Sequence, residues 1–540
     1  METNNILDNY FFTFDSDMFD DIQTKLYGFS ISKLNGEIIL SNNTKNIIGG
    51  CYILIEKEND KIKITQDELS SMYLYYYKEC DYWAISNSFY NICKLLNKKG
   101  KQITVRNLYI EQYLHQNLHV RSFDKTMSNE IFFMNSFSTM YLTKTSLDII
   151  EHDAEFETVD IFSKQGICVI DSWIDKWSNV IKSFYNSNIK IKIDLSGGFD
   201  SRTIFCLAKN AGINFNSQNI NVYSKIGTTK GLIEHLDDDY NIAEQIANRL
   251  NFILNLHNDL FKTSTYKNDS ECQYEILRNL FMFTHKEGYL CISIPYEPTI
   301  HLGGLNGEFV RRKLTDFVDP NKNCHNNPFR LSQDVIDEYY NDLKICENKS
   351  KSIFERNARF YLNTQNKSHY GACIYNDFIL NTFLVSPFND KSLLKLKVPE
   401  EIDPNIIFAI IIYRTAPEIF DIDFSSGRKF DEIVKQKTIE ICSKYPKQKK
   451  IYDLECNISH NLTKKLVENT DNKNGDHVMF DVFLKNKELL IDYMSNVWGE
   501  KYANDIYEYA KSFYLNKDNF FPNKWVVALT SIIELLNIIK

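Results

Sequence analysis

The 540-residue chain lacks the cysteine patterns that mark metal centres and disulfide scaffolds. Its 12 cysteines are scattered between Cys51 and Cys456, with no Cys-x-x-Cys pair and no Cys/His cluster at the spacing of a zinc site. Isolated cysteines of this kind are typical of reduced thiols. We therefore expect a cytoplasmic protein that depends on neither zinc nor disulfide bonds.

Long basic blocks and membrane segments are also missing. The net charge is −9, and the short basic run Lys447–Lys450 is typical of a solvated loop, so we expect no nucleic-acid partner. The acidic start METNNILDNYFFTFD has neither the basic residues nor the apolar core of a signal peptide. The longest apolar stretch, residues 525–539, is interrupted by polar residues and is shorter than the ~20 residues that cross a bilayer. It predicts a buried terminal helix and no membrane association.

What is present is the composition of a folded protein. Hydrophobic residues make up 43% and aromatic residues 14% of a chain that is too long for one core, so we expect two or three domains. Up to about residue 150, polar and apolar residues alternate as they do in strands. Trp173, Trp177 and Ile181 then follow a helical spacing, and strands and helices alternate until a mostly helical region beyond about 330. The alternation predicts a parallel sheet with helices on both faces.

The stretch IKIDLSGGFDSRTIFCLAKNAGINF, residues 191–215, places two glycines between a strand and a helix. Glycines let a ligand approach the backbone, and a helix N-terminus offers unpaired amides and positive potential, so the turn predicts a phosphate site. Asp200 would repel phosphate unless the two share a divalent cation. The alternative is a plain strand–helix turn with Ser or Asp as the N-cap. The complete string Ser196–Ser201 favours the phosphate site.

A second loop, HLGGLNGEFVRR at residues 301–312, has three glycines followed by Glu308, Arg311 and Arg312. One carboxylate and two guanidinium groups on a flexible loop could hold a metal ion and a polyphosphate. Alternatively, the loop is a turn that starts a helix, with Glu308 placed in the first turn by the helix dipole. Together with the first loop, it favours a phosphate and metal site.

The string SGGFDS resembles the pyrophosphate loop of ATP pyrophosphatases, and the order of the following motifs resembles the asparagine synthetase family. A strand near Val222–Lys225 matches the strand that contacts adenine, and the acidic segment 237–252 follows it as in that family. GGLNGEFVRR, aligned without gaps, puts Gly304 on the family's glycine and Glu308 on its metal-binding aspartate. Pro387–Asp390 is similar to the family's Pro-Phe-Leu-Asp. The resemblance covers residues 160–430.

This resemblance implies an ATP-dependent ligase that forms AMP and pyrophosphate. A carboxylate attacks the α-phosphorus of ATP, and an amine then displaces AMP from the acyl-adenylate. Mg²⁺ would be held by Asp200 and Glu308. Lys429, in SSGRKF, is the best match for the family's catalytic lysine, and Arg428 is its rival. The residues that would bind ATP and pyrophosphate are Leu195, Ser196, Gly197, Gly198, Asp200, Ser201 and Gly304.

One position departs from the family. A Glu-x-Arg that precedes Pro-Phe-Leu-Asp is replaced by residues 383–386, FLVS, so the carboxylate that assists the second half-reaction is missing. An adenylating enzyme that uses another nucleophile and a non-catalytic ATP-binding scaffold therefore stand as alternatives.

Residues 1–155 resemble the glutaminase domain of the same family, of the N-terminal nucleophile type, in QDELSSMYLYY (66–76) and AISNS (84–88). The family's nucleophilic cysteine is replaced by Glu2, and Gln66 stands in place of an arginine. Beta-lactam synthetases, similar relatives, show the same loss. The amine would therefore belong to a small-molecule substrate, or ammonia would come from a separate glutaminase.

The expected fold class is α/β with three parts. Residues 1–155 would form a degenerate glutaminase-like α+β sandwich. Residues 160–430 would form a doubly wound parallel-sheet ATP pyrophosphatase domain, and residues 431–540 a helical C-terminal extension.

Overall fold

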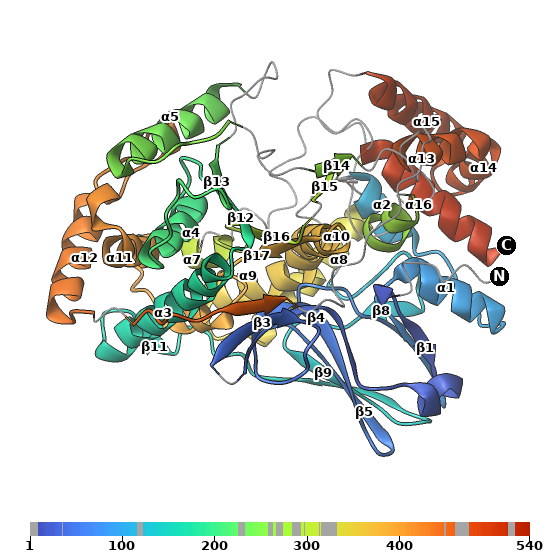
Figure 1. Cartoon of the computed structure of the whole chain (residues 1–540). Helices are drawn as coiled ribbons and strands as arrows, with labels where there is room; N and C mark the ends of the chain where they lie inside the picture. Colours follow the sequence, from blue (N-terminus) through green and yellow to red (C-terminus); the bar gives the residue numbers. More distant parts are fainter. Residues whose placement is uncertain are drawn as a thin grey trace.

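The computed structural model combines antiparallel and parallel sheets with many helices in a mixed α/β fold (Figure 1). Glu2, Lys225 and the pair 448–449, which the sequence analysis singled out, lie outside the described residues. The structure describes residues 9–34, 36–115, 123–224, 233–256, 263–265, 274–282, 293–295, 297–312, 314, 332–447, 450–458, 475–516 and 524–540.

Two sheets are built mainly from the first 151 residues. Their strands are antiparallel, except that β19 pairs in parallel with β3. The four-stranded sheet, in the order β1-β7-β6-β8, contains β1 (Thr13–Asp15), β6 (Tyr75–Glu79), β7 (Tyr82–Ser86) and β8 (Ile131–Phe133). The seven-stranded sheet, in the order β10-β9-β5-β4-β2-β3-β19, contains β2 (Lys25–Leu34), β3 (Glu37–Ser41), β4 (Ile47–Glu58), β5 (Lys61–Gln66), β9 (Ser138–Leu142), β10 (Leu147–Glu151) and β19 (Cys456–Ile458).

The alternation seen in the sequence explains these strands. In β5, Ile62 and Ile64 are fully buried, whereas Lys61, the first residue of the strand, is exposed. The two sheets share one core, in which the rings of Phe12 and Tyr27 lie 4.4 Å apart. The strand β19 comes from the region expected to be a helical extension, so that region also completes the N-terminal sheet.

A third sheet is entirely parallel and has the order β13-β12-β16-β17. From β12 the chain first adds β13 on one side and later β16 on the other, so the strand order reverses beside β12. Ligands of open α/β sheets bind at such a reversal, outside the carboxyl ends of the strands. The strands are β12 (Lys190–Asp194), β13 (Ile220–Tyr223), β16 (Thr299–Leu302) and β17 (Thr382–Val385).

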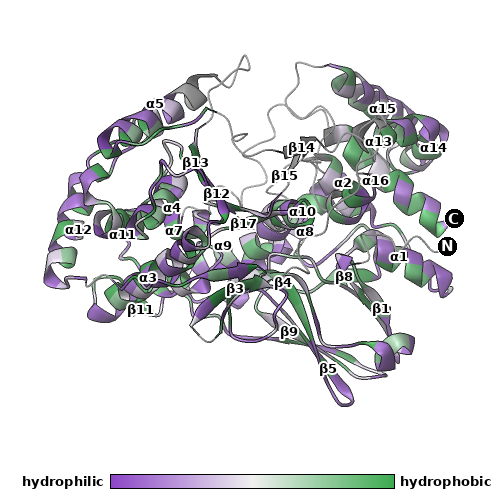
Figure 2. Ribbon diagram, viewed as in Figure 1, coloured by the Kyte–Doolittle hydropathy of each residue, from purple (hydrophilic) through white to green (hydrophobic). Residues whose placement is uncertain are grey.

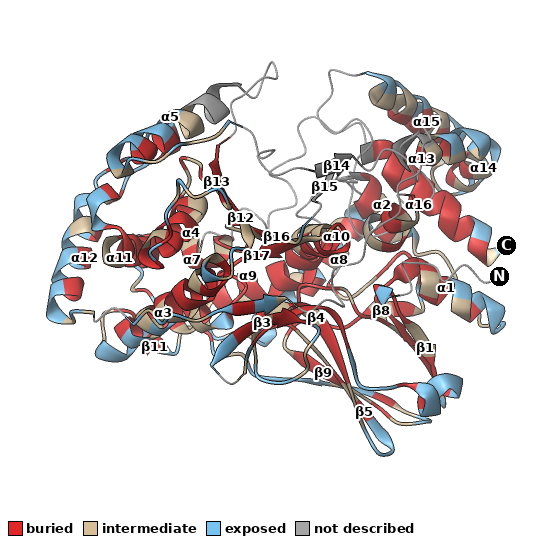
Figure 3. Ribbon diagram, in the orientation of Figure 1, coloured by how far each residue is buried: buried red, intermediate tan, exposed pale blue. Residues whose placement is uncertain are grey.

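Helices pack around this sheet, with α3, α4 and α11 together and α10 against β17 (Figure 1). Ile191 and Ile193 of β12 are completely buried, and buried residues concentrate on the sheet, α4 and α11 (Figure 3). Polar residues gather on the outer helices α5 and α12 (Figure 2). These helices are α3 (Lys164–Asn186), α4 (Phe199–Asn210), α5 (Ile233–Leu250), α10 (Ala372–Ile379), α11 (Ile406–Thr415) and α12 (Glu432–Lys444).

The last helix, α16, confirms the buried terminal helix expected from residues 525–539, because Val526 to Ile533 are buried. None of the helices among the described residues has the length and apolarity needed to cross a membrane. The remaining longer helices are α1 (Phe89–Lys98), α2 (Asn107–His115), α8 (Gln333–Asn348), α9 (Ile353–Tyr361), α13 (Gly475–Lys485), α14 (Lys487–Trp498), α15 (Glu500–Leu515) and α16 (Lys524–Ile539).

Short elements fill the connections. They are the 3₁₀ helices η2 (Ser16–Asp21), η7 (Lys391–Lys395), η8 (Pro417–Ile419) and η9 (Ser425–Gly427), the helix α7 (Glu308–Arg311), the π-helix η3 (Leu277–Phe281), and the strands β11 (Val159–Asp160), β14 (Thr263–Thr265), β15 (Ser293–Pro295) and β18 (Leu396–Lys397).

A ten-residue π-helix, η6 (Leu362–Gly371), joins the N-terminal sheets to the rest of the protein through buried polar side chains. The ammonium group of Lys367 donates to the carbonyl of Ser70 at 2.7 Å, and the amide of Asn366 donates to the carbonyl of Leu69 at 3.0 Å. Both side chains are fully buried, and burial lowers the pKa of Lys367 to about 7. These polar contacts, called the polar seam below, accompany an apolar contact between the two parts of the chain, in which the rings of Phe29 and Phe378 lie 5.5 Å apart.

Candidate active site

The two glycine loops of the sequence analysis lie against each other at the reversal in strand order. The first follows β12 and the second follows β16, its neighbour in the sheet. A Cβ atom on Gly304 would lie 2.8 Å from the Cβ of Asp200 and 3.1 Å from the backbone nitrogen of Ser201. A Cβ atom on Gly307 would overlap the carboxylate of Asp200. The second loop therefore needs glycine at both positions to approach Asp200 so closely.

Hydroxyl groups fix the shape of the first loop. The two hydroxyls of Ser196 and Ser201 are 2.7 Å apart, and the Ser201 hydroxyl also accepts from the Ser196 amide at 3.1 Å. The amide of Gly198 donates to the Ser196 hydroxyl at 3.2 Å. Leu195 is buried and carries the strand into the loop, where its amide donates to the carbonyl of Tyr223 at 3.0 Å.

The N-terminus of α4 differs from the plain capped turn considered above. Its N-cap is Gly198, and no side chain in the described part of the chain caps it. Neither Ser nor Asp therefore has the N-cap role. The free amides of a first helical turn can bind an anion. This geometry favours the phosphate interpretation of the loop.

Asp200, Glu308 and Arg311 form a charged cluster between the loops. The Arg311 guanidinium donates to Oδ2 of Asp200 and lies 3.6 Å from Oε1 of Glu308. The Tyr370 hydroxyl donates to the same Glu308 oxygen at 2.9 Å. Burial raises the pKa of Asp200 to about 7, the negative charge of Glu308 acts in the same direction, and Arg311 opposes both. Two carboxylates thus share one guanidinium group.

Two carboxylate oxygens of this cluster accept no hydrogen bond within the described part of the chain. Oδ1 of Asp200 and Oε2 of Glu308 are buried and have no hydrogen-bond partner among the described residues. Buried carboxylate oxygens without a partner are suitable ligands for a divalent cation, so the donor chemistry of these two residues fits the Mg²⁺ ligands expected from the sequence. Within the described ranges, no group of three or more His, Cys, Asp or Glu side chains could hold a metal ion. Mg²⁺ commonly binds one or two carboxylates and completes its shell with water and substrate phosphate.

A third segment, residues 425–430, completes the surroundings of the first loop. The Ser425 amide donates to the carbonyl of Gly197 at 2.9 Å. Arg428 donates to the Ser425 hydroxyl at 2.9 Å, and its guanidinium lies 5.6 Å from the centre of the Phe199 ring. Lys429 is exposed beside it. The structure therefore brings Arg428 to the loop, while the catalytic role of Lys429 stays a prediction.

The acidic segment 237–252 also reaches this place through α5. The carboxylate of Asp238 accepts from the Ser426 amide, and Oδ1 of Asp239 would lie 2.8 Å from a Cβ atom on Gly197. Sequence reasoning included this segment but missed Ser425 and Tyr370. A serine among several and a tyrosine 62 residues after Glu308 give no pattern that points to the site.

The two neighbouring arginines of the second loop diverge. Arg311 faces Asp200, whereas the Arg312 side chain is only 5% exposed and points away. Arg312 donates to Glu157 at 2.7 Å, and its guanidinium lies 4.1 Å from the centre of the Phe354 ring. Of these two arginines, only Arg311 is therefore placed to act at the loops.

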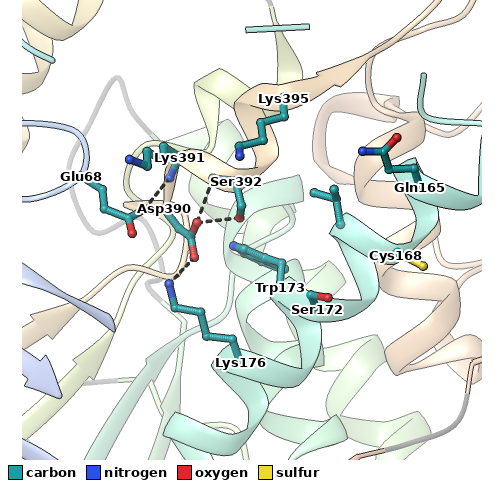
Figure 4. A pocket seen from close by; sticks show the side chains of 11 residues that line it. Glu68, Gln165, Cys168, Ser172, Trp173, Lys176, Asp390, Lys391, Ser392 and Lys395 are labelled. Atoms are coloured by element: carbon teal, nitrogen blue, oxygen red, sulfur yellow. Dashed lines mark hydrogen bonds and ion pairs between the residues drawn. The ribbon is translucent and has the colours of Figure 1, made fainter. Parts of the chain in front are cut away.

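The Pro387–Asp390 motif contacts the second loop, because the amide of Asn306 donates to Oδ1 of Asn389 at 3.4 Å, and it also fixes one part of the chain to another. Asp390 accepts from Lys176 at 2.7 Å and from the Trp177 indole at 3.0 Å, beside an open pocket of about 430 Å³ (Figure 4). Although burial opposes the charged form, Lys176 holds the pKa of Asp390 below its usual value. Asn389 accepts from the Ser71 hydroxyl at 3.1 Å.

His301 and Asp194 link the strands just before the two loops. Nε2 of His301 lies 2.8 Å from Oδ1 of Asp194. Although burial opposes the protonated form, the charge of Asp194 and this hydrogen bond raise the pKa of His301. The pair ties β12 to β16 and so holds the two loops at a fixed separation.

The sequence matches no family model and no curated protein.

Proposed function

We propose that the chain is an ATP-dependent, AMP- and pyrophosphate-forming ligase that adenylates a carboxylate and transfers it to an amine. The observation that carries this proposal is the contact of the loops after β12 and β16 through Gly304, Gly307 and Asp200. That contact puts two carboxylates, an arginine and uncapped helix amides at one point. Such a combination suits a polyphosphate with a divalent cation.

In the first step, the amides of the first loop and the Ser196 and Ser201 hydroxyls bind the β- and γ-phosphates of ATP. Arg311 and Arg428 approach the same loop and balance phosphate charge. Asp200 and Glu308 would hold Mg²⁺, which when bound stabilises the charge that develops on pyrophosphate. The α-phosphorus is then open to in-line attack by the substrate carboxylate, which forms the acyl-adenylate and releases pyrophosphate.

In the second step, an amine attacks the activated carbonyl and AMP leaves. Residues 383–386 offer no carboxylate to take the proton from the amine. This observation favours one second candidate, an adenylating enzyme whose acceptor is not an amine. Identifying the acceptor in the product separates the two, because only amide formation carries the nitrogen of an isotope-labelled amine into the product.

The domain plan proposed with this function follows the asparagine synthetase family. Residues 160–430 would be a doubly wound ATP pyrophosphatase domain, and residues 1–155 a glutaminase-like domain without its nucleophile. The amine would come from a second small-molecule substrate, or ammonia from a separate glutaminase.

Calorimetric titration with ATP, with and without Mg²⁺, tests the proposal. We expect Asp200→Asn to weaken Mg²⁺-dependent ATP binding at least about ten-fold, which is about 1.4 kcal/mol. Asp505→Asn, on the exposed side of α15, is the control and should leave binding unchanged. Binding that Asp200→Asn leaves intact would remove the metal role of Asp200. Absence of ATP binding in all three proteins would reject the ligase and leave the two loops as a structural turn.

A further inference from the structure

A side chain of the protein already places a positive charge beside the carboxylates of Asp200 and Glu308. Arg311 donates to Oδ2 of Asp200 and lies 3.6 Å from Oε1 of Glu308, while the second oxygen of each carboxylate stays buried without a partner in the described part of the chain. One guanidinium therefore neutralises one of two negative charges. The remaining negative charge would attract a metal ion.

A divalent cation and Arg311 cannot share this position favourably. With both carboxylates deprotonated, the pair and Arg311 carry a net charge of −1, and adding a divalent cation would leave +1 in a largely buried site. The cation would also lie a few ångströms from the guanidinium, where like charges repel strongly outside bulk water. An incoming polyphosphate changes this balance, because it adds several negative charges and is a preferred bidentate partner of arginine.

Arg311 has the freedom to change partners, whereas its neighbour does not. The Arg311 side chain is 28% exposed, whereas that of Arg312 is 5% exposed. Arg312 is held by Glu157, by the carbonyl of Leu396 and by the face of Phe354. Arg311 is therefore the arginine of this loop that can exchange Asp200 for an incoming phosphate.

We propose that Arg311 is an internal counter-ion that keeps divalent cations out of the Asp200–Glu308 pair until the phosphates of ATP bind and take over the guanidinium. The metal then enters with or after the nucleotide, never before it. This inference rests on the proposed function, because it assigns Arg311 to the phosphates of the same site.

Binding of Mn²⁺ alone, followed by the paramagnetic signal of the free ion, tests the counter-ion role without any turnover. We expect Arg311→Met to bind Mn²⁺ at least about ten-fold more tightly than the wild type. The double variant Arg311→Met/Asp200→Asn should lose this gain, which places the metal on the proposed carboxylates. Arg249→Met removes an exposed arginine from α5 and should behave as the wild type. Unchanged Mn²⁺ binding by Arg311→Met would overturn the inference.

Binding of ATP in the presence of Mn²⁺ should change in the opposite direction. Arg311→Met loses a phosphate partner, so we expect its affinity for ATP to fall about ten-fold while its affinity for Mn²⁺ alone rises. A general loss of structure would lower both affinities and would count against the inference. Arg311→Lys keeps the charge and should exclude Mn²⁺ as the wild type does, which provides a second test should Arg311→Met fail to fold.

The outcomes also separate this inference from the proposed function. If no variant binds ATP but Arg311→Met gains Mn²⁺, the ligase and the transfer of Arg311 to phosphate are rejected, and only the exclusion of the metal by Arg311 is supported. If ATP binds and Arg311→Met gains no Mn²⁺, the counter-ion role alone is rejected.

Discussion

Gly304 and Asp200 touch at a distance that leaves no room for a side chain at Gly304, since a Cβ atom there would lie 2.8 Å from the Cβ of Asp200. Gly304→Ala must therefore push the two loops apart or displace the carboxylate. We expect it to weaken Mg²⁺-dependent ATP binding at least about ten-fold, because a displacement of about 1 Å is costly at such a site. Calorimetry provides the measurement.

The adjacent glycine supplies a matched control. A Cβ atom on Gly303 would meet only Leu384, at an ordinary contact distance of 3.7 Å. Gly303→Ala should therefore bind ATP as the wild type does. Equal losses in both variants would mean that general loop rigidity, and not the approach to Asp200, sets the affinity.

Arg428 and Lys429 are neighbours with different placements, and their substitution separates their roles. Both residues are exposed, but Arg428 reaches the first loop through its hydrogen bond to Ser425 and its approach to the ring of Phe199. We expect Arg428→Met to weaken ATP binding about ten-fold and Lys429→Met to change it less than about two-fold. A catalytic role of Lys429 would then show only in turnover. If Lys429→Met has the larger effect on ATP binding, the segment rearranges when the nucleotide binds.

The sequence predicted the parts of the site that local geometry determines. An alternating strand that ends in Ser196–Ser201 can hardly form anything but a tight strand–helix turn, and Glu308 follows three glycines in a second loop. The pairing of these loops also follows from their positions after neighbouring parallel strands. Their contact through Gly304 and Asp200 is the structural counterpart of that expectation.

Contacts between side chains that are far apart in the sequence could not be predicted in the same way. Arg311 and Arg312 look equivalent in the sequence, and only the packing of Phe354 and Glu157 turns one of them away. The contact of Tyr370 with Glu308 depends on η6, which adopts the rare π geometry. A short strand such as β19, with three residues and no strong alternation, is likewise defined by its partner β3 and not by its own sequence.

The buried Lys367 predicts a specific dependence of stability on pH. Burial lowers the pKa of this lysine from 10.5 in the unfolded chain to about 7 in the folded protein. Below pH 7 both states are protonated, so the full cost of burying the charge is present. Between pH 7 and 10.5 only the unfolded state keeps the proton, and stability therefore rises with pH, by up to about 1.4 kcal/mol per unit.

Lys367→Met should remove this contribution. We expect the free energy of unfolding of the wild type to rise between pH 7 and 9 relative to that of Lys367→Met, measured by urea denaturation at each pH. Lys351→Met removes an exposed lysine from the same region and should keep the wild-type slope. Identical slopes for the wild type and Lys367→Met would show that Lys367 remains charged in the folded protein.

Asn389 occupies the position of the leucine in the Pro-Phe-Leu-Asp motif that Pro387–Asp390 resembles. It accepts from the Ser71 hydroxyl at 3.1 Å and donates to the carbonyl of Gly50 at 3.1 Å, so it belongs to the contact with the N-terminal sheets. Asn389→Leu would leave buried polar groups unpaired. We expect a loss of about 2–4 kcal/mol in the free energy of unfolding, measured in urea.

A matched change tests whether this contact is responsible. Ser71→Ala removes only the hydroxyl from the same pair and should cost about 1 kcal/mol. If Asn389→Leu proved as stable as the wild type, the apolar contacts of the interface would be sufficient without the polar seam.

The pairing of β19 with β3 determines when the seven-stranded sheet can be completed during synthesis of the chain. The side chains of Asn457 and Glu37, which meet at 2.8 Å across this pair, are separated by 420 residues of chain. Until residues 456–458 have been synthesised, this edge of β3 has no partner strand. Exposed strand edges pair readily with strands of other chains. The seven-stranded sheet, whose other strands leave the ribosome first, is thus completed only after residue 458 has been made.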